Sequence, residues 1–173
     1  MAILQVNHLA KTFSNSTIVL KDISFSVEKG ECLTIIGSSG SGKSTLLRCL
    51  NLLEKPDSGE IIFDGKNILE NKTNQNHIRS RLVMVFQSFN LFNNMDVLTN
   101  CVIGQTKVLK RSKKEATEIA LRNLEKVGMS DRVHFKIRDI SGGQKQRVAI
   151  ARALSMNPDI ILFATYYYDC CYS

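Results

Sequence analysis

The chain has 173 residues, of which 43% are hydrophobic and 23% charged, and it carries a formal net charge of +7 with a sequence pI near 9.3. These values indicate one globular domain and exclude a disordered chain. No apolar run approaches the ~18 residues that span a bilayer, and we see no secretory signal, so a cytosolic location is expected. Positive charge alone is compatible with nucleic acid, an anionic membrane or anionic small ligands.

The predicted elements alternate between strands and helices along the chain. Apolar runs of strand length occur at Ile18–Val27, Cys32–Ile36, Ile61–Phe63, Leu82–Phe86 and Ile160–Phe163. Helical periodicity occurs at Ser44–Leu53, Lys113–Val127 and Gln144–Leu154. Strands buried on both faces and alternating with helices favour an α/β core with a partly parallel sheet. The cysteines form no C-x-x-C pair, which argues against a zinc site, and Cys32 and Cys49 are expected to be reduced core residues.

The first strong motif is a glycine-rich turn between a predicted buried strand and a predicted helix. It satisfies G-x-x-x-x-G-K-[ST] and consists of Gly37, Ser38, Ser39, Gly40, Ser41, Gly42, Lys43, Ser44 and Thr45. The glycines allow the backbone N–H groups to turn toward one anion, and the helix adds the positive end of its dipole. Lys43 supplies a charge for the β- and γ-phosphates, and Ser44 a hydroxyl for Mg²⁺. This motif predicts binding of a nucleoside triphosphate.

A second candidate anion site precedes the helix predicted near residue 144. The sequence "ISGGQKQRVAIARAL" places Ser141, Gly142, Gly143 and Gln144 where free backbone N–H groups are expected at a helix N-terminus. An ordinary helix cap formed by Ser141 would explain the same pattern.

Taken together, these residues resemble the ATP-binding subunits of ABC transporters, over residues 3 to about 163. Ser141–Gln144 match the signature motif of that family, Gln87 in "MVFQSFNLF" matches its Q-loop, and Phe13 matches the aromatic residue that stacks on adenine. The segments "LLRCLNLLEKPDSGEIIFDG" and "FQSFNLFNNMDVLTN" are similar to the polar amino acid uptake branch of bacterial importers. For Phe13 a packed strand residue, and for Gln87 a polar residue at a strand end, remain alternatives.

The resemblance implies a fold, partners and cofactors. The fold would be a P-loop NTPase of ABC ATPase type, with a mixed sheet, an antiparallel β-subdomain and a helical subdomain at roughly residues 90–155. Residues 1–163 would form an incomplete ATP-binding domain, and 164–173 a tail outside the family pattern. ATP with Mg²⁺, the ion held by Ser44 and Gln87, would join two subunits head to tail. The Gln87 region would contact membrane-spanning permease subunits at the cytoplasmic face of the cell membrane. An extracytoplasmic amino acid binding protein would be an indirect partner, and nucleic acid none.

The end of the chain departs from the family pattern. Two acids should follow the strand that ends at Phe163, but Ala164 and Thr165 occupy those positions. Asp159 lies at the other end of the strand, roughly 16 Å away at about 3.3 Å per residue. Asp169 lies beyond the strand, and the family's D-loop and switch histidine are absent; His134 precedes the signature motif and cannot replace that histidine. We therefore expect impaired hydrolysis and interpret the tail as a truncation or frame disruption.

Three readings of the whole chain stay open. The first is an importer subunit that couples ATP binding and hydrolysis to amino acid uptake, here catalytically impaired. The second is a regulatory module that binds ATP without hydrolysing it. The third, a DNA-repair ATPase of the same superfamily, is disfavoured because no coiled-coil insertion separates the two motifs. Cys170 and Cys171 as a metal or redox pair would need partner ligands that the neighbouring sequence does not offer.

Overall fold

The computed structural model describes residues 2–13, 17–70 and 74–164. The chain divides into two compact units, residues 1–79 and residues 80–173. Thr165, Asp169, Cys170 and Cys171 lie outside the described residues, so the expectations that concern them stay predictions. None of the described helices combines the length and the apolar character that crossing a bilayer would require.

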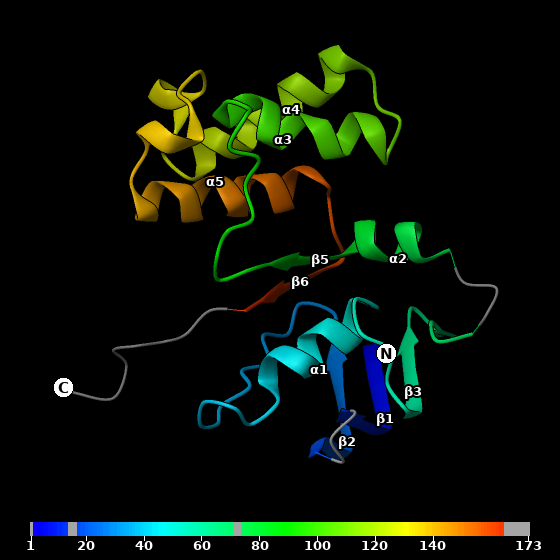
Figure 1. Ribbon diagram of the computed structural model, residues 1–173. Coiled ribbons are helices and arrows are strands. Elements are labelled where there is room, and N and C mark those ends of the chain that lie inside the picture. Colours follow the sequence, from blue (N-terminus) through cyan, green and yellow to red (C-terminus); the bar gives the residue numbers. More distant parts are fainter. Residues whose placement is uncertain (1, 14–16, 71–73, 165–173) are drawn as a thin grey trace. The chain divides into compact units, whose positions relative to one another are not determined.

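The first unit contains an antiparallel sheet of order β2-β1-β3-β4 (Figure 1). Its strands are β1 (Ala2–Phe13), β2 (Thr17–Glu28), β3 (Ser58–Phe63) and β4 (Lys66–Asn67). Period-two alternation buries Leu4 and Val6 on β1 and Ile61 and Phe63 on β3, so one face of the sheet forms the core. Helix α1 (Lys43–Leu50) buries Leu46, Cys49 and Leu50. Helix α2 (Gln75–Arg81) spans the boundary between the two units, which falls after residue 79.

The strand expected at Cys32–Ile36 is not formed, and this prediction was wrong. Residues 31–38 have no regular secondary structure, and Ile36 is 90% exposed. A strand of parallel type needs hydrogen-bonded neighbours, and among the described residues no strand pairs with this segment. Cys32 is consequently exposed rather than in a core, whereas Cys49 is buried as expected, and both thiols are free.

The second unit places a parallel pair of strands beside helices. Its strands are β5 (Leu82–Val85) and β6 (Ile160–Phe163), and its helices are α3 (Val97–Lys107), α4 (Lys113–Lys126) and α5 (Gly142–Ser155), with short 3₁₀ turns at Ser130–Arg132 and Ile137–Asp139. The register pairs Leu82 with Ile160 and Val85 with Phe163, which confirms a parallel component. The antiparallel and parallel strands belong to separate sheets, and no described strand pairs with the second edge of β6.

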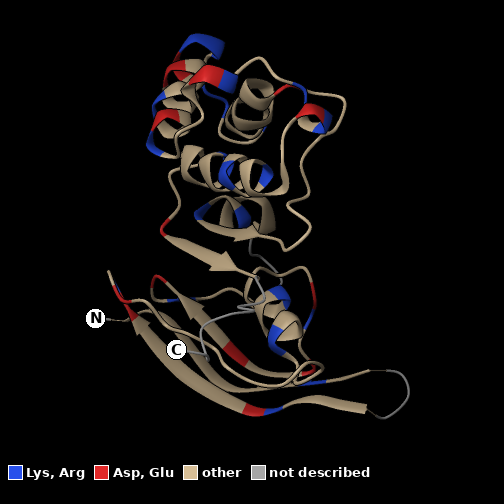
Figure 2. Cartoon of the chain, turned by 90° about the vertical axis from the view of Figure 1, so that its left-hand side faces the viewer, with Lys and Arg blue, Asp and Glu red and all other residues tan. Residues whose placement is uncertain are grey.

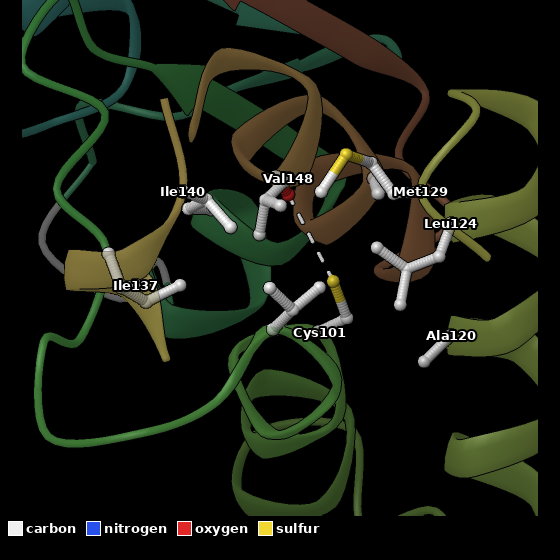
Figure 3. Packing of buried hydrophobic residues seen from close by; sticks show 9 residues of the cluster. Cys101, Ala120, Leu124, Met129, Ile137, Ile140 and Val148 are labelled. Carbon is white, nitrogen blue, oxygen red and sulfur yellow. Dashed lines mark hydrogen bonds between the residues drawn. The ribbon is translucent and has the colours of Figure 1, made fainter. Parts of the chain in front are cut away.

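Helix α5 is shared by two hydrophobic cores of the second unit. Val148 and Ala151 belong to a cluster with residues of α3 and α4 (Figure 3). Ala149 and Ala153 pack instead with Val85 of β5. The thiol of Cys101, at the centre of the first cluster, points toward the carbonyl oxygen of Val148 at 3.9 Å (Figure 3). The small residues Ala149, Ala151 and Ala153 of α5 suit a helix that packs against other elements on two sides.

Side-chain caps begin each of these three helices. The Asp96 carboxylate accepts a hydrogen bond from the N–H of Thr99 at the start of α3, and Ser112 accepts one from Glu115 at the start of α4. Helix α4 carries basic and acidic residues side by side (Figure 2). Helix α5 differs, because its sequence "GGQKQRVAIARALS" contains three cations and no acid.

Candidate functional site

The phosphate loop of the first unit is organised around the side chain of Lys43. Its ammonium Nζ donates to the carbonyl oxygens of Gly37 at 2.6 Å and Ser38 at 2.7 Å, and lies 3.2 Å from Ser41 Oγ. These three acceptors are neutral, so an anionic phosphate oxygen would be a stronger acceptor for the same ammonium. The Lys43 ammonium therefore lies within the loop and can exchange these neutral acceptors for an anionic one.

Gly42 fixes the start of α1 against the sheet. It is the N-cap of the helix, with φ 89° in the left-handed region that favours glycine. A Cβ added here would lie 2.7 Å from the carbonyl oxygen of Val19 on β2. The loop can thus approach the strand only because position 42 has no side chain. Ser44, one residue after Lys43, is exposed and presents its hydroxyl at the first turn of α1.

Phe13 stands at the end of β1 with 41% of its surface exposed. The Nζ of Lys11 lies 5.4 Å from the centre of its ring, a cation–π contact. Lys11 also pairs with Glu54 at 3.0 Å and with Asp57 at 3.3 Å. Asp57 in turn accepts a hydrogen bond from the backbone N–H of Thr12, which holds the pKa of its carboxyl below the ordinary 3.8. Phe13 is therefore a supported, accessible ring rather than a core residue.

The second unit presents Ser141, Gly142, Gly143 and Gln144 at the N-terminus of α5. Ser141 and Gln144 form a capping box: Gln144 N–H donates to Ser141 Oγ at 3.3 Å, and Ser141 N–H donates to Gln144 Oε1 at 2.8 Å. The cap that the sequence suggested for Ser141 is thus formed. A Cβ added at Gly142 or Gly143 would meet nothing within 4 Å, and neither residue has a positive φ. Packing within this unit does not account for the two glycines.

Gln87 lies in an exposed turn just after β5. The N–H of Phe89 donates to the carbonyl oxygen of Phe86 at 3.0 Å, so Gln87 and Ser88 are the two central residues of a β-turn. Phe89 and Asn90 follow with φ 60° and 46°, both left-handed. Their carbonyl oxygens accept hydrogen bonds from Arg152 on α5.

The end of β6 offers no carboxylate within the described residues. Ala164 donates its N–H to the carbonyl oxygen of Val85 at 2.9 Å, so the position expected for an acid is held against β5. Asp159 is paired with Arg81 through a 2.6 Å contact at the opposite end of the strand. The Asp159 carboxylate is therefore already paired, and it lies at the opposite end of β6 from Ala164. His134 is exposed between the two 3₁₀ turns.

The predicted site residues therefore fall into two groups. Residues 37–45 and Phe13 belong to the first unit, and Gln87, Ser141–Gln144 and Ala164 belong to the second. Sequence reasoning missed Lys11, Asp57 and Arg152. A signal for Arg152 was available, because it stands four residues after Val148 within an apolar helical pattern and so falls on a covered face.

Comparison with known proteins gives consistent matches. The family model described as ABC transporter matches residues 20–163. The arginine transport ATP-binding protein ArtM of Bacillus subtilis is 49% identical over 92% of this chain and 66% of ArtM. The glutamine transport ATP-binding protein GlnQ of Geobacillus stearothermophilus is 47% identical over 90% of this chain and 64% of GlnQ. The chain thus spans just under two thirds of the length of these relatives.

Solved structures agree with the sequence matches. The ATP-binding cassette MJ0796, in a dimeric post-hydrolysis state bound to ADP and Pi, matches with a TM-score of 0.84 and 33% identity over 92% of this chain and 72% of that one. The structure of cbiO1 from Clostridium perfringens, part of the complex cbiONQ, matches with a TM-score of 0.82 and 33% identity over 94% of this chain and 64% of that one. The predicted fold class is confirmed.

Proposed function

The chain belongs to the ABC transporter family, and from this premise we propose that it is an ATP-binding subunit of an importer of polar amino acids. Relatives named for arginine and for glutamine transport support this class of cargo without choosing one amino acid. The permease subunits would receive the movement through the loop that carries Gln87, at the cytoplasmic face of the membrane. An extracytoplasmic binding protein would deliver the amino acid.

One observation carries the proposal: the Lys43 ammonium is held at the mouth of the phosphate loop by the carbonyls of Gly37 and Ser38. In our proposal the phosphates of ATP take over this ammonium, and the backbone N–H groups of residues 37–45 enclose them. Phe13 would stack on the adenine ring, with the Lys11 network behind it.

The residues at hand fit a Mg²⁺ ion only in part. We propose that Ser44 contributes a hydroxyl and Gln87 an amide oxygen, each of a type that Mg²⁺ accepts together with phosphate and water oxygens. Bound there, Mg²⁺ would neutralise phosphate charge. Ala164 offers no carboxylate to order the ion's water shell, and Thr165 cannot ionise either. We therefore propose ATP binding with strongly reduced hydrolysis.

The glycines at the start of α5 support a dimer. Gly142 and Gly143 have open space where a side chain would lie, so close approach of a ligand from outside the unit would explain them. We assign this ligand as the phosphates of ATP held by a second copy of the subunit. A non-hydrolytic regulatory module is the second candidate, because it combines the intact phosphate loop with Ala164 at the acidic position.

Titration with a fluorescent ATP analogue tests the binding site. Lys43→Ala removes a charged donor, and we expect affinity to fall about 10- to 100-fold, which corresponds to roughly 1.5–3 kcal/mol for a charge-assisted hydrogen bond. Arg48→Ala is the matched control, since Arg48 is an exposed cation on the same helix. Equal affinities for the wild type and Lys43→Ala would refute the site.

A further inference from the structure

The turn that carries Gln87 is followed by a strained segment. Phe89 and Asn90 are consecutive non-glycine residues in the left-handed region, which such residues occupy only when surrounding contacts hold them there. Local hydrogen bonds join Asn90 N–H to the Ser88 carbonyl at 2.7 Å and Ser88 Oγ to Asn90 Oδ1 at 2.8 Å. These contacts shape the segment but do not attach it to the rest of the unit.

The segment is attached to the unit in two ways: the Phe89 side chain packs against the core that contains Ala149 and Ala153 of α5, and Arg152 of the same helix forms hydrogen bonds to the backbone. Arg152 Nη1 donates to the carbonyl oxygen of Asn90 at 2.7 Å, and its Nη2 donates to that of Phe89 at 2.9 Å. One planar guanidinium thus holds two successive carbonyls, a fixed geometry that a lysine ammonium cannot reproduce. Because Phe89 also closes the β-turn through its N–H, the residue that Arg152 holds is the residue that shapes the turn around Gln87.

The guanidinium is partly buried, and within the described residues it has no paired acid. Burial lowers its pKa from the ordinary value. Among the described residues no carboxylate forms an ion pair with it, and α5 itself contains no acid. A partly desolvated cation gains from hydrogen bonds, so the two carbonyl oxygens offset part of the cost of burying the guanidinium. The arrangement therefore strongly favours this one conformation of the loop.

A second anchor farther along the loop serves as a contrast. The fully buried Asn100 of α3 accepts a hydrogen bond from Phe92 N–H at 2.8 Å and donates to the Phe92 carbonyl at 3.2 Å. It attaches the loop to α3, five residues after Gln87. Arg152, in contrast, binds carbonyl oxygens two and three residues after Gln87, and it belongs to the helix whose N-terminus carries Ser141–Gly143.

We propose that Arg152 is a positioning residue that holds the Gln87 turn in one conformation and ties this turn to the helix of the Ser141–Gly143 motif. The proposal rests on the ATP-binding function proposed above. In this arrangement α5 is the common support of both motifs, so a displacement of one is passed to the other through two hydrogen bonds. In this role Arg152 acts through the carbonyl oxygens of Phe89 and Asn90.

The test compares the affinity of the full chain for a fluorescent ATP analogue with Mg²⁺ and with EDTA. The dissociation constant in EDTA divided by the dissociation constant with Mg²⁺ gives a ratio that isolates the contribution of the metal. Arg152→Met should reduce this ratio about 10-fold, as loss of an outer-shell partner typically does. Arg152→Lys keeps the charge but should lower the ratio in the same direction. Gln87→Ala should also lower it, and combining Gln87→Ala with Arg152→Met should lower it no further.

Two controls separate positioning from general destabilisation. Arg147→Met removes an exposed cation from the same helix, and Val148→Ala opens a cavity in the core on the other side of α5. Both should leave the ratio at its wild-type value, even where Val148→Ala lowers thermal stability. An unchanged ratio in both Arg152 variants, or multiplying effects of Gln87→Ala and Arg152→Met, would overturn the proposal.

Amide hydrogen exchange gives a readout that does not need nucleotide. In Arg152→Met, exchange in residues 86–92 should accelerate at least about 10-fold more than exchange in α3 and α4, because the strained turn loses its anchor. A uniform acceleration, or none, would contradict the positioning role. If the wild type binds no nucleotide with or without metal, the proposed function fails, and the exchange result alone decides the role of Arg152.

Discussion

Replacing Gly42 by alanine tests whether the phosphate loop depends on close contact with β2. The substitution forces a side chain into a residue with φ 89° and places its Cβ 2.7 Å from the Val19 carbonyl oxygen and 3.1 Å from Leu20 Cδ2. The left-handed conformation alone costs about 1–2 kcal/mol. Overpacking against backbone adds roughly 1–3 kcal/mol, because a carbonyl cannot move aside as a side-chain tip can. We expect a total loss of about 2–5 kcal/mol, a large part of the typical ~5–15 kcal/mol margin.

Two glycines of the same chain separate these contributions. Gly40 has nearly the same φ, 82°, but a Cβ there meets nothing within 4 Å, so Gly40→Ala should cost only the strain, about 1–2 kcal/mol. Gly142 has neither strain nor neighbours, so Gly142→Ala should be neutral or slightly stabilising.

Urea unfolding without nucleotide, followed by circular dichroism, gives the ranking, and hydrogen exchange of β2 and α1 shows whether the loss is local. Equal stability of Gly40→Ala and Gly42→Ala would refute the close-contact argument. A destabilised Gly142→Ala would show that the space at the start of α5 is not open.

Three further predictions concern catalysis, acid stability and thiol reactivity. Phosphate-release assays should show turnover near background, and Ala164→Asp combined with Thr165→Glu should recover little; robust turnover in the unmodified chain would mean that the acids were misplaced. The lowered pKa of Asp57 stabilises the fold above pH 3.8, and this stabilisation is lost as the pH falls through the folded-state value. Acid titration should therefore show the stability gap between wild type and Asp57→Asn closing below about pH 4, and a gap that widens there would contradict the assignment. Iodoacetamide followed by mass spectrometry should label exposed Cys32 in the native chain and Cys101, whose pKa burial raises to about 12, only after unfolding; native labelling of both thiols at similar rates would refute the burial of Cys101.

Local patterns predicted those parts of the fold that local interactions determine. The helix at Lys113–Val127 appears as α4, Lys113–Lys126, because its periodicity and its Ser112 cap act within the segment. The strand at Ile160–Phe163 forms as predicted because a hydrophobic partner, β5, is available. The strand predicted at Cys32–Ile36 does not form, because an apolar run becomes a strand only beside neighbouring strands. No pattern within the run shows whether such neighbours are present.

The candidate site shows the same division between local and distant information. The phosphate loop was found because its chemistry lies within nine consecutive residues, Gly37–Thr45. The contacts that support Phe13 and the Gln87 turn were not found, because Lys11 meets Asp57 across 46 positions of the chain and Arg152 meets Asn90 across 62. Such pairs follow from tertiary packing: the helical period can show that Arg152 lies on a covered face, but it cannot show which residue Arg152 contacts.

Helix α5 has a bearing on how this chain can tolerate change. Ala149 and Ala153 meet the strand side, while Ala151 and Val148 meet the helical side, so neighbouring positions answer to different surroundings. A larger residue at any of the three alanines would push the helix away from one core and into the other, and neither side can relax by moving α5 alone. We therefore expect these three positions to tolerate only the smallest side chains. Substitutions that adapt such a subunit to a new partner would therefore have to lie in the loops and outer helices, and the packed alanines of α5 would stay unchanged.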